Sequence, residues 1–382
     1  MLKKLFNFFL LLFISLFFFL ISDYFISKHT NLFHIKKDCF KYLRFKNNDK
    51  EYYSYELEKN CYAFENKGTT FAYKVVTNNL GHRIANKNLE KDLEKEKIIF
   101  LGDSFTYGFG INYKDSIPGQ IDKKTNNKFE VINFAMPGYS PSINLYKLEE
   151  YLKNSKKLKI KKIFYVMDLS DVHDESNRWS NIKNINLPVI IDENIKKEIK
   201  DTFEFKQNFR TSKFLSSLVN NNVRNFRKKI KFYFSKNKVV NSLDVKTFWG
   251  KFTYTSTSNL ANDVEYRKLW PVDYKIGIKN IKKKIKKISD LIKPYNTEFY
   301  IVIHPWKETL EYGQEEFNWE FFANEICILT NCNKVISLFD DVRDLKRENI
   351  LWKSEIYFKK DVHFNKKGND LYSNRIYFDA FN

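Results

Sequence analysis

The sequence has few cysteines and no closely spaced cysteine pair. Among its 382 residues there are four, Cys39, Cys61, Cys327 and Cys332, and no two form the C-x2-C pair typical of a four-cysteine zinc site. An even number of cysteines permits two disulfides in an oxidising compartment. We predict that Cys327 pairs with Cys332 where a helix ends and a strand begins, and that Cys39 pairs with Cys61. Free buried thiols are the alternative.

Basic residues outnumber acidic residues in the chain. No internal repeat is evident. The chain has 66 Lys and Arg against 46 Asp and Glu, a net charge of +20, which raises the question of nucleic-acid or anionic membrane partners. The excess is mostly lysine and accompanies abundant Asn, Ile, Phe and Tyr, which indicates a chain-wide bias in residue choice. The densest cluster, Lys275 to Lys287, has isoleucines at helical spacing and predicts a surface helix with one buried face. We therefore expect no nucleic-acid partner.

The amino-terminal segment differs from the rest of the chain. Two lysines precede the apolar stretch Leu5 to Ile21, whose only polar members are Asn7 and Ser15. As a helix this stretch spans about 26 Å, close to the roughly 30 Å hydrocarbon thickness of a bilayer. No small-residue cleavage site follows, so we predict an uncleaved transmembrane signal anchor over residues 1–26 rather than a cleaved signal peptide. The lysines favour a cytoplasmic amino end, which puts the remaining residues in the periplasm or outside the cell.

The rest of the chain divides into a short irregular part and an α/β part. Residues 27–68 are charged and aromatic without a clean period, which predicts a membrane-proximal stalk or irregular wrap. Residues 69–382 have a βαβ rhythm, broken by a basic and aromatic insertion at about 175–265. This pattern predicts a doubly wound, mostly parallel five-stranded sheet. After an edge strand at 69–77, strands are expected at 97–103, 129–135, 161–167, 298–304 and 334–339, and helices at 114–125, 141–154, 272–293, 316–330 and 365–377.

The most informative motif is Gly102-Asp103-Ser104, which ends the first apolar strand of this rhythm. A hydroxyl at that position lies at the carboxyl edge of the sheet, where ligands bind in open α/β folds. With a helix starting behind it, Ser104 can act as a nucleophile whose own backbone N–H points into an oxyanion site. An ordinary turn or a helix cap is the alternative interpretation.

A nucleophilic serine needs a base within hydrogen-bond reach and a group that orients that base. Among the six histidines, His363 has a short-range partner in Asp361, on a loop that leads into the last predicted helix. The rival is His173, which with Asp171 and Asp174 could bind a metal. That spacing matches no established ligand pattern, so we expect no metal and no other cofactor.

Taken in chain order, these motifs resemble the SGNH/GDSL hydrolase family over roughly residues 75–378, apart from the insertion. The resemblance implies the flavodoxin-like fold of that family and a catalytic triad of Ser104, His363 and Asp361. It also implies that the backbone N–H of Gly138, in the segment Asn-Phe-Ala-Met-Pro-Gly-Tyr, serves the oxyanion hole together with that of Ser104.

The chain departs from the family pattern in two places. The family's third block normally supplies an oxyanion-hole asparagine, whereas Ser170 occupies that position here, so Ser170 or Asn133 would have to replace it. The terminal block is D-x-H rather than D-x-x-H. Followed by Phe-Asn, it resembles a membrane-anchored branch of the superfamily, as do the D-x-S-D-x-x-D-E segment at 168–175 and the Pro-Trp element that contains Trp306.

The resemblance implies a hydrolase. With the predicted anchor, we expect an extracytoplasmic serine esterase that removes a small acyl group, such as acetyl, from a cell-envelope glycan or lipid. Trp306 and Asp103 are the candidate substrate contacts, and Tyr312 could line the same cleft as Trp306, although buried packing explains these aromatic residues equally well. One alternative is an O-acyltransferase that uses the same three catalytic residues. Another is a non-catalytic glycan-binding or assembly protein, an alternative that the missing asparagine keeps open.

Overall fold

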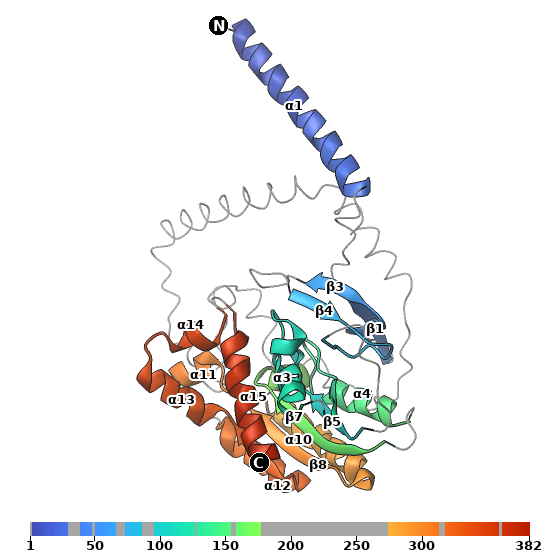
Figure 1. Cartoon of the computed structure of the whole chain (residues 1–382), viewed down its shortest axis with the longest axis vertical. Coiled ribbons are helices and arrows are strands. Elements are labelled where there is room, and N and C mark those ends of the chain that lie inside the picture. The colour runs from blue at the N-terminus through green and yellow to red at the C-terminus, as the bar shows by residue number, and fades with distance from the viewer. Residues whose placement is uncertain are drawn as a thin grey trace. The chain divides into compact units, whose positions relative to one another are not determined.

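The computed structural model describes residues 2–29, 39–47, 50–65, 73–85, 95–126, 128–153, 158–176, 274–312, 318–358 and 361–382. The chain divides into two compact units, and helix α1 (Leu2–His29) is the described element of the first. All the other elements belong to the second unit (Figure 1). The predicted insertion lies outside the described residues from position 177 onward.

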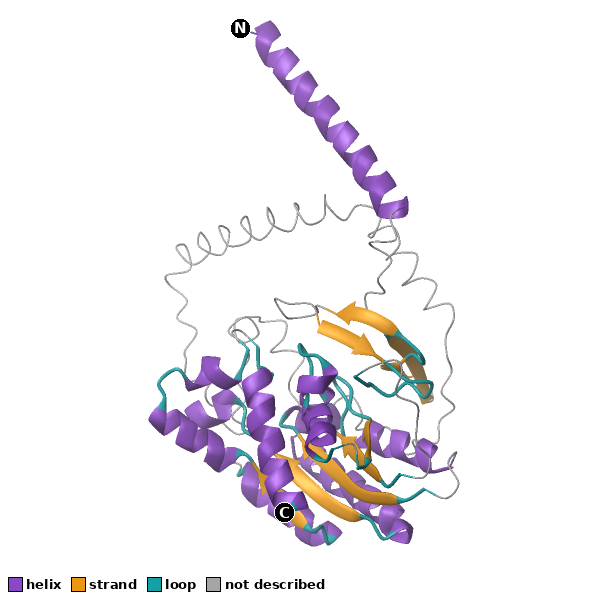
Figure 2. Ribbon diagram, in the orientation of Figure 1, coloured by secondary structure: helices purple, strands orange, loops and turns teal. Residues whose placement is uncertain are grey.

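A five-stranded parallel sheet forms the centre of the second unit (Figure 2). Its strands follow the order β6-β5-β7-β8-β9, so the direction of winding reverses between β5 and β7. The expected doubly wound α/β sheet is confirmed, and ligands of such sheets bind beyond the carboxyl ends of the strands at this reversal. The strands are β5 (Lys97–Leu101), β6 (Glu130–Asn133), β7 (Ile160–Met167), β8 (Glu298–Ile303) and β9 (Lys334–Ser337).

Helices cover both faces of this sheet because its central strands are apolar on both sides. Helices α4 (Pro141–Lys153), α10 (Tyr274–Ile292) and α12 (Trp319–Thr330) form one layer, in which α10 contacts both of the others (Figure 1). On the other side α15 (Lys366–Phe381) contacts α3 (Ile117–Lys124). The lysine-rich helix α10 has the buried face that its isoleucines predict, with Ile281, Ile285, Ile288 and Ile292 in the core.

Several short helices connect these layers near the carboxyl ends of the strands. They are α2 (Ser104–Tyr107), η2 (Tyr113–Asp115), α5 (Ser170–Ser176), α11 (Lys307–Tyr312), α13 (Phe339–Glu348) and α14 (Trp352–Ile356), whereas η3 (Lys293–Tyr295) precedes the amino end of β8. Of these, α2, α5 and α11 directly follow β5, β7 and β8 or are separated from them by a few residues. The side chains at the starts of α2, α5 and α11 therefore gather at one edge of the sheet.

The segment expected to be irregular between residues 27 and 60 instead contains an antiparallel hairpin of β1 (Phe40–Asn47) and β2 (Lys50–Leu57). A second pair joins β3 (Tyr62–Glu65) to β4 (Tyr73–Val76), within the expected 69–77 edge strand, of which residues 69–72 lie outside the described residues. Charged and aromatic residues do not alternate regularly along these two segments of the sequence, so the two-residue period of a strand is not visible there. Cross-strand pairs such as Lys41 with Glu56, whose charged atoms lie 3.2 Å apart, hold the strands together instead.

Both expected disulfides are present. The Cα atoms of Cys39 and Cys61 are 5.8 Å apart, and those of Cys327 and Cys332 are 4.8 Å apart. The first bond joins the start of β1 to the start of β3 and so closes the hairpin. The second joins the end of α12 to the segment just before β9, as the sequence predicts.

The two disulfides differ in the length of chain that they close, which predicts different effects on stability. Loop-closure entropy assigns about 3 kcal/mol to the Cys39–Cys61 bond and about 2 kcal/mol to the Cys327–Cys332 bond. Urea unfolding of the full chain should therefore show a larger loss for Cys39→Ala/Cys61→Ala than for Cys327→Ala/Cys332→Ala. Equal losses, or free thiols at either pair in non-reducing peptide maps, would contradict this expectation.

Helix α1 is long and apolar enough to cross a membrane. Its stretch Leu5–Asp23 has 19 residues and a mean hydropathy of 2.6, a judgement that rests on length and composition. An amino-terminal apolar helix and two disulfides together suggest a secreted or extracytoplasmic protein. The retention of α1 as an uncleaved membrane anchor stays a prediction.

Candidate active site

Ser104 lies immediately beyond the carboxyl end of β5, at the reversal of the sheet. Strand β5 ends at Leu101, and Gly102 fits the close approach to α2, because a Cβ there would lie 2.4 Å from Oγ1 of Thr106. The carboxylate of Asp103 caps α2 by accepting the N–H of Phe105 at 3.0 Å. Ser104 is the first residue of that helix, so its own N–H has no acceptor within the helix.

His363 and Asp361 lie beside Ser104 on the segment that leads into α15. Nε2 of His363 is 2.7 Å from Oγ of Ser104, and Nδ1 of His363 is 2.5 Å from Oδ1 of Asp361. The same carboxylate oxygen accepts the backbone N–H of His363 at 3.0 Å. The amino end of α15 is capped by Asn365, which leaves Asp361 for the imidazole. The structure thus brings together the three side chains that the sequence predicts as a triad.

A lysine fixes the segment that carries Asp361. Nζ of Lys307, the first residue of α11, donates to the backbone carbonyl of Asp361 at 2.9 Å. Burial raises the pKa of Asp361, but its hydrogen bond to His363 and the charges of His363 and Lys307 outweigh burial and hold that pKa below its usual value. Asp361 is therefore ionised and can hold the imidazole of His363 through Nδ1, with Nε2 facing Ser104. Sequence reasoning missed Lys307, because nothing distinguishes it from the many other lysines.

Aromatic rings fix the plane of the His363 imidazole. The ring centroids of Phe105 and Phe109 are 4.9 and 4.8 Å from that of His363. Phe105 also packs against the buried His304, at 4.1 Å between centroids. Phe105 directly follows Ser104, so the same short helix presents the hydroxyl and supports the base.

The turn at Gly138 offers a second backbone donor. The N–H of Tyr139 bonds to the carbonyl of Met136 at 3.0 Å, and Gly138 has φ +75°, as the third position of a type II turn requires. Within the described part of the chain, the N–H groups of Gly138 and Ser104 have no hydrogen-bond acceptor. Both are therefore available to an incoming oxyanion.

The side chains expected to replace the third-block asparagine are otherwise engaged. The hydroxyl and the backbone N–H of Ser170 both donate to Oδ1 of Asp168, at 2.5 and 2.8 Å. The amide of Asn133 donates to the carbonyl of Thr106 at 3.2 Å, and its oxygen accepts the N–H of Ala135 at 3.0 Å. An oxyanion role for Ser170 or Asn133 stays a prediction.

Asp168 is the centre of a buried layer beneath the site. Its Oδ2 accepts the indole N–H of Trp306 at 2.6 Å, and Trp306 is 5% exposed. Burial, and next the charge of Asp168, raise the pKa values of Asp103 and Asp171. Because Trp306 and Asp103 are buried and bonded in this way, substrate contacts by either residue stay predictions.

The metal interpretation at His173 is not addressed by the described side chains. Those of His173 and Tyr312 lie outside them, although their helices are described. Among the side chains that are described, no group of three or more His, Cys, Asp or Glu could hold a metal ion.

We expect Lys307 to act as a positioning residue. Lys307→Met should lower kcat for ester hydrolysis by about 10- to 100-fold with little change in KM, because the Asp361 segment loses its anchor and the triad its alignment. Lys307→Arg should restore most of the activity. The matched control is Lys346→Met, which removes another lysine–carbonyl bond to α11, from Nζ of Lys346 to Leu310 at 2.5 Å, and keeps the bond from Lys307 to Asp361. Equal losses in the Lys307 and Lys346 variants would contradict the assignment.

His304 gives the fold a predicted sensitivity to acid. Burial lowers its pKa to about 4, the charge of Asp168 raising it only in part. Neither ring nitrogen makes a hydrogen bond with the described residues, although Nε2 is 3.5 Å from Oδ2 of Asp168. Between pH 6.5 and 4, His304 binds a proton in the unfolded chain but not in the folded chain. The free energy of unfolding therefore falls as the pH falls, by up to about 3 kcal/mol from this residue.

His304→Phe should remove that dependence while filling the same space between rings. The raised pKa values of Asp103 and Asp171 act in the opposite direction, so the difference between variant and wild type isolates His304. Chemical unfolding at pH 7 and pH 4 should show the variant gaining stability relative to wild type on acidification. The same pH dependence in both proteins would contradict the prediction.

Comparisons with solved structures find esterases. A member of the lipolytic G-D-S-L family from Veillonella parvula is 12% identical, with a TM-score of 0.37, covering 75% of this chain and 98% of that one. The psychrotrophic esterase EstA from Pseudoalteromonas sp. is 11% identical, with a TM-score of 0.37, covering 74% and 95%. An acetylxylan esterase from Geobacillus stearothermophilus is 9% identical, with a TM-score of 0.37, covering 75% and 95%. No protein-family model and no curated sequence matches this chain.

Proposed function

We propose that this protein is a serine esterase of the SGNH type. The observation that carries the proposal is the hydrogen-bonded chain from Oγ of Ser104 through His363 to Asp361, with contacts of 2.7 and 2.5 Å. A nucleophile, a base and a group that orients the base are the minimum set for acyl transfer through a serine. A binding protein without catalytic function would have no need of this alignment.

In the proposed mechanism, Nε2 of His363 takes the proton of Ser104 as Oγ attacks the ester carbonyl carbon. The ionised Asp361 holds Nδ1–H and stabilises the imidazolium that forms. The tetrahedral oxyanion accepts hydrogen bonds from the backbone N–H groups of Ser104 and Gly138. Its collapse expels the alcohol, which receives the proton from His363, and leaves an acyl-serine.

Water completes the cycle. His363 removes a proton from a water molecule, which attacks the acyl-serine through a second tetrahedral oxyanion. Collapse of that intermediate releases the carboxylic acid and returns the proton to Oγ of Ser104. If a sugar hydroxyl enters in place of water, the same steps transfer the acyl group to that sugar.

We further propose that α1 anchors the chain in the cell membrane, with residues 39–382 on the extracytoplasmic side. The apolar stretch of α1 and the two disulfides support that location. The terminal block with Asp361, His363, Phe364 and Asn365 supports a place in the membrane-anchored branch of the SGNH superfamily. An esterase at this location meets the acylated glycans and lipids of the cell envelope. We propose that it removes a small acyl group, such as acetyl, from one of these.

The proposal is tested with the full chain purified in a neutral detergent. Nitrophenyl acetate, butyrate and octanoate report hydrolysis and acyl length, and acetylated glycans with and without an added sugar acceptor report acetate release against transfer. We expect turnover that is fastest with acetate. No turnover of any ester by folded protein would contradict the enzyme assignment, and a preference for octanoate would contradict the small acyl group.

A further inference from the structure

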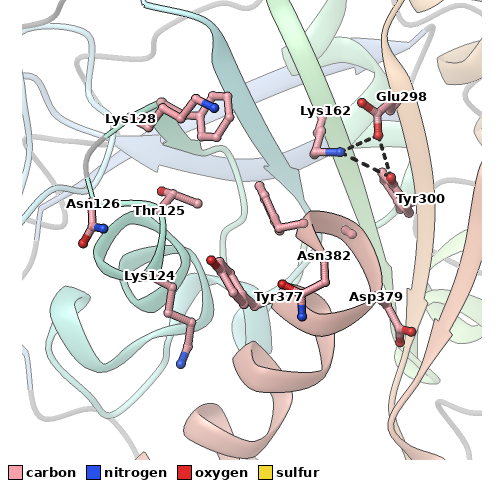
Figure 3. A pocket seen from close by; sticks show the side chains of 13 residues that line it. Lys124, Thr125, Asn126, Lys128, Lys162, Glu298, Tyr300, Tyr377, Asp379 and Asn382 are labelled. Carbon is pink, nitrogen blue, oxygen red and sulfur yellow. Dashed lines mark hydrogen bonds and ion pairs between the residues drawn. The ribbon is translucent and has the colours of Figure 1, made fainter.

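A hollow lies at the edge of the sheet opposite Ser104. It is a cavity of about 510 Å³ between the ends of α3 and α15 and the starts of β6, β7 and β8 (Figure 3). Lys162 is the third residue of β7 and Glu298 the first of β8, so both lie at the amino-terminal edge, whereas Ser104 follows the carboxyl end of β5. The volume lies within the range of small-molecule sites. The mechanism at Ser104 makes no use of this cavity.

Three lysines line the cavity (Lys124, Lys128 and Lys162), against two carboxylate side chains (Glu298 and Asp379). Glu298 forms an ion pair with Lys162 and lies 3.6 Å from Lys161, and Asp379 bonds to Lys334 at 2.5 Å. Both acidic side chains of the lining are thus already paired with lysines. This leaves the charges of two further lining lysines, Lys124 and Lys128.

Neither of these lysines has a carboxylate partner in the described part of the chain. Lys124, at the end of α3, donates to the side-chain oxygen of Asn374 at 2.5 Å. Lys128, which is exposed, lies over the Phe129 ring at 5.3 Å. Both lysines line the cavity, although their amino groups point in different directions in Figure 3. Lysines without a carboxylate partner favour an anionic ligand.

The inner wall is aromatic and carries a hydroxyl. Tyr377 stacks on Phe381 with 5.5 Å between ring centroids, and Figure 3 shows the Tyr377 side chain directed into the cavity. Its hydroxyl has no hydrogen-bond partner among the described residues. Lys162, whose side chain is 9% exposed, is held over the Phe381 ring at 5.2 Å and the Tyr300 ring at 5.3 Å. Sugar-binding sites commonly combine an aromatic wall, which packs against the apolar face of the sugar ring, with hydrogen-bond donors for its hydroxyl groups.

We propose that this cavity binds an acidic saccharide, a sugar unit that carries a carboxylate or a phosphate. Lys124 and Lys128 receive the anionic group, the Tyr377 hydroxyl bonds to a sugar hydroxyl, and the ring wall covers the apolar side of the sugar. The cavity is too large for a phosphate ion alone, and the Lys162–Glu298 ion pair forms part of its wall. Because it lies at the edge opposite Ser104, binding here requires no chemistry at the triad.

Titration calorimetry of the full chain in neutral detergent tests the site. The probes are a galacturonate tetramer, glucose 6-phosphate, inorganic phosphate and the neutral cellotetraose. We expect saturable, salt-sensitive binding of at least one acidic sugar, and none of cellotetraose. The tetramer and the sugar phosphate distinguish a uronate from a phosphorylated sugar as the natural ligand. No binding of either, or phosphate bound as tightly as the sugars, would overturn the proposal.

Variants then locate the binding. Lys124→Ala/Lys128→Ala should weaken it about tenfold. Tyr377→Phe, which keeps the ring stacking, should weaken it by about two- to tenfold. The charge-matched control Lys279→Ala/Lys283→Ala removes two exposed lysines of α10 and should bind as wild type does. Equal weakening in the control, or wild-type binding by both cavity variants, would overturn the assignment.

Aryl-ester hydrolysis separates this proposal from the function proposed for Ser104. Ser104→Ala should bind the acidic sugar with wild-type affinity, and Lys124→Ala/Lys128→Ala should hydrolyse nitrophenyl acetate at the wild-type rate. Loss of sugar binding in Ser104→Ala would overturn the separate site, whether or not the protein is an esterase.

Discussion

Ser104→Ala should lower ester hydrolysis by about 10⁴-fold or more while the protein remains folded. Oγ of Ser104 is the atom that forms the covalent bond in the proposed mechanism, and neither water nor a neighbouring side chain can take its place in the acyl-enzyme. The steady-state rate with nitrophenyl acetate, measured on the full chain, gives the loss.

The same variant should cost little stability. Oγ of Ser104 contacts Nε2 of His363 at 2.7 Å and Oδ2 of Asp103 at 3.5 Å, and the side chain is only partly buried. We expect the free energy of unfolding to change by less than about 1 kcal/mol. Ser289→Ala is the matched control, because it removes a hydroxyl on α10 that donates to the carbonyl of Thr330 at 2.8 Å and leaves the triad intact. Substantial activity in Ser104→Ala would exclude Ser104 as the nucleophile.

His363→Ala should cost nearly as much activity as Ser104→Ala, and the double variant little more than either. The base and the nucleophile act as one unit, so once the first is removed the second has no further contribution to lose. The measurement is a double-mutant cycle of kcat/KM with nitrophenyl acetate, with unfolding of each variant followed in parallel.

The cycle has a clear contrary outcome. If the two losses add, His363 and Ser104 serve separate functions, and the 2.7 Å contact between them is structural. His173 would then be the next base to test. The activity of Asp361→Asn should lie between that of wild type and that of His363→Ala. This variant keeps the shape of the side chain but removes the charge that orients the imidazole.

The secondary structure of the sheet domain could be predicted closely where an apolar stretch is followed by residues that end a strand or begin a helix. The strand expected at 97–103 ends at Leu101, because Gly102 turns the chain and Asp103 already caps the next helix. The strand expected at 334–339 ends at Ser337, since Phe339 begins α13. The last helix runs beyond residue 377 to Phe381, whose ring packs against Phe129 and Phe164.

What could not be predicted depends on contacts between distant segments. The β1–β2 hairpin has no clean alternation, and only cross-strand pairing and packing against the sheet domain reveal it: the Tyr139 hydroxyl donates to the Tyr55 carbonyl at 2.7 Å. The short helices α2 and α5 are too brief for a helical period.

The candidate triad was predictable because each member belongs to a short local motif. Ser104 follows a strand, and Asp361 and His363 are two residues apart. Lys307 was not predictable, because its function depends on one bond to a carbonyl 54 positions away. The hydrogen bond from the Ser170 hydroxyl to Asp168 was equally unpredictable, because the sequence does not show which acceptor a serine hydroxyl will bond to.

Covalent labelling by a fluorophosphonate tests the central claim most directly. The reagent reacts with a serine only when a base activates it and an oxyanion site receives the phosphoryl oxygen. Intact mass and peptide mapping of the folded full chain should show one adduct, on Ser104, which is absent from Ser104→Ala and strongly slowed in His363→Ala. No adduct on folded wild-type protein, or an adduct on another residue, would contradict the account.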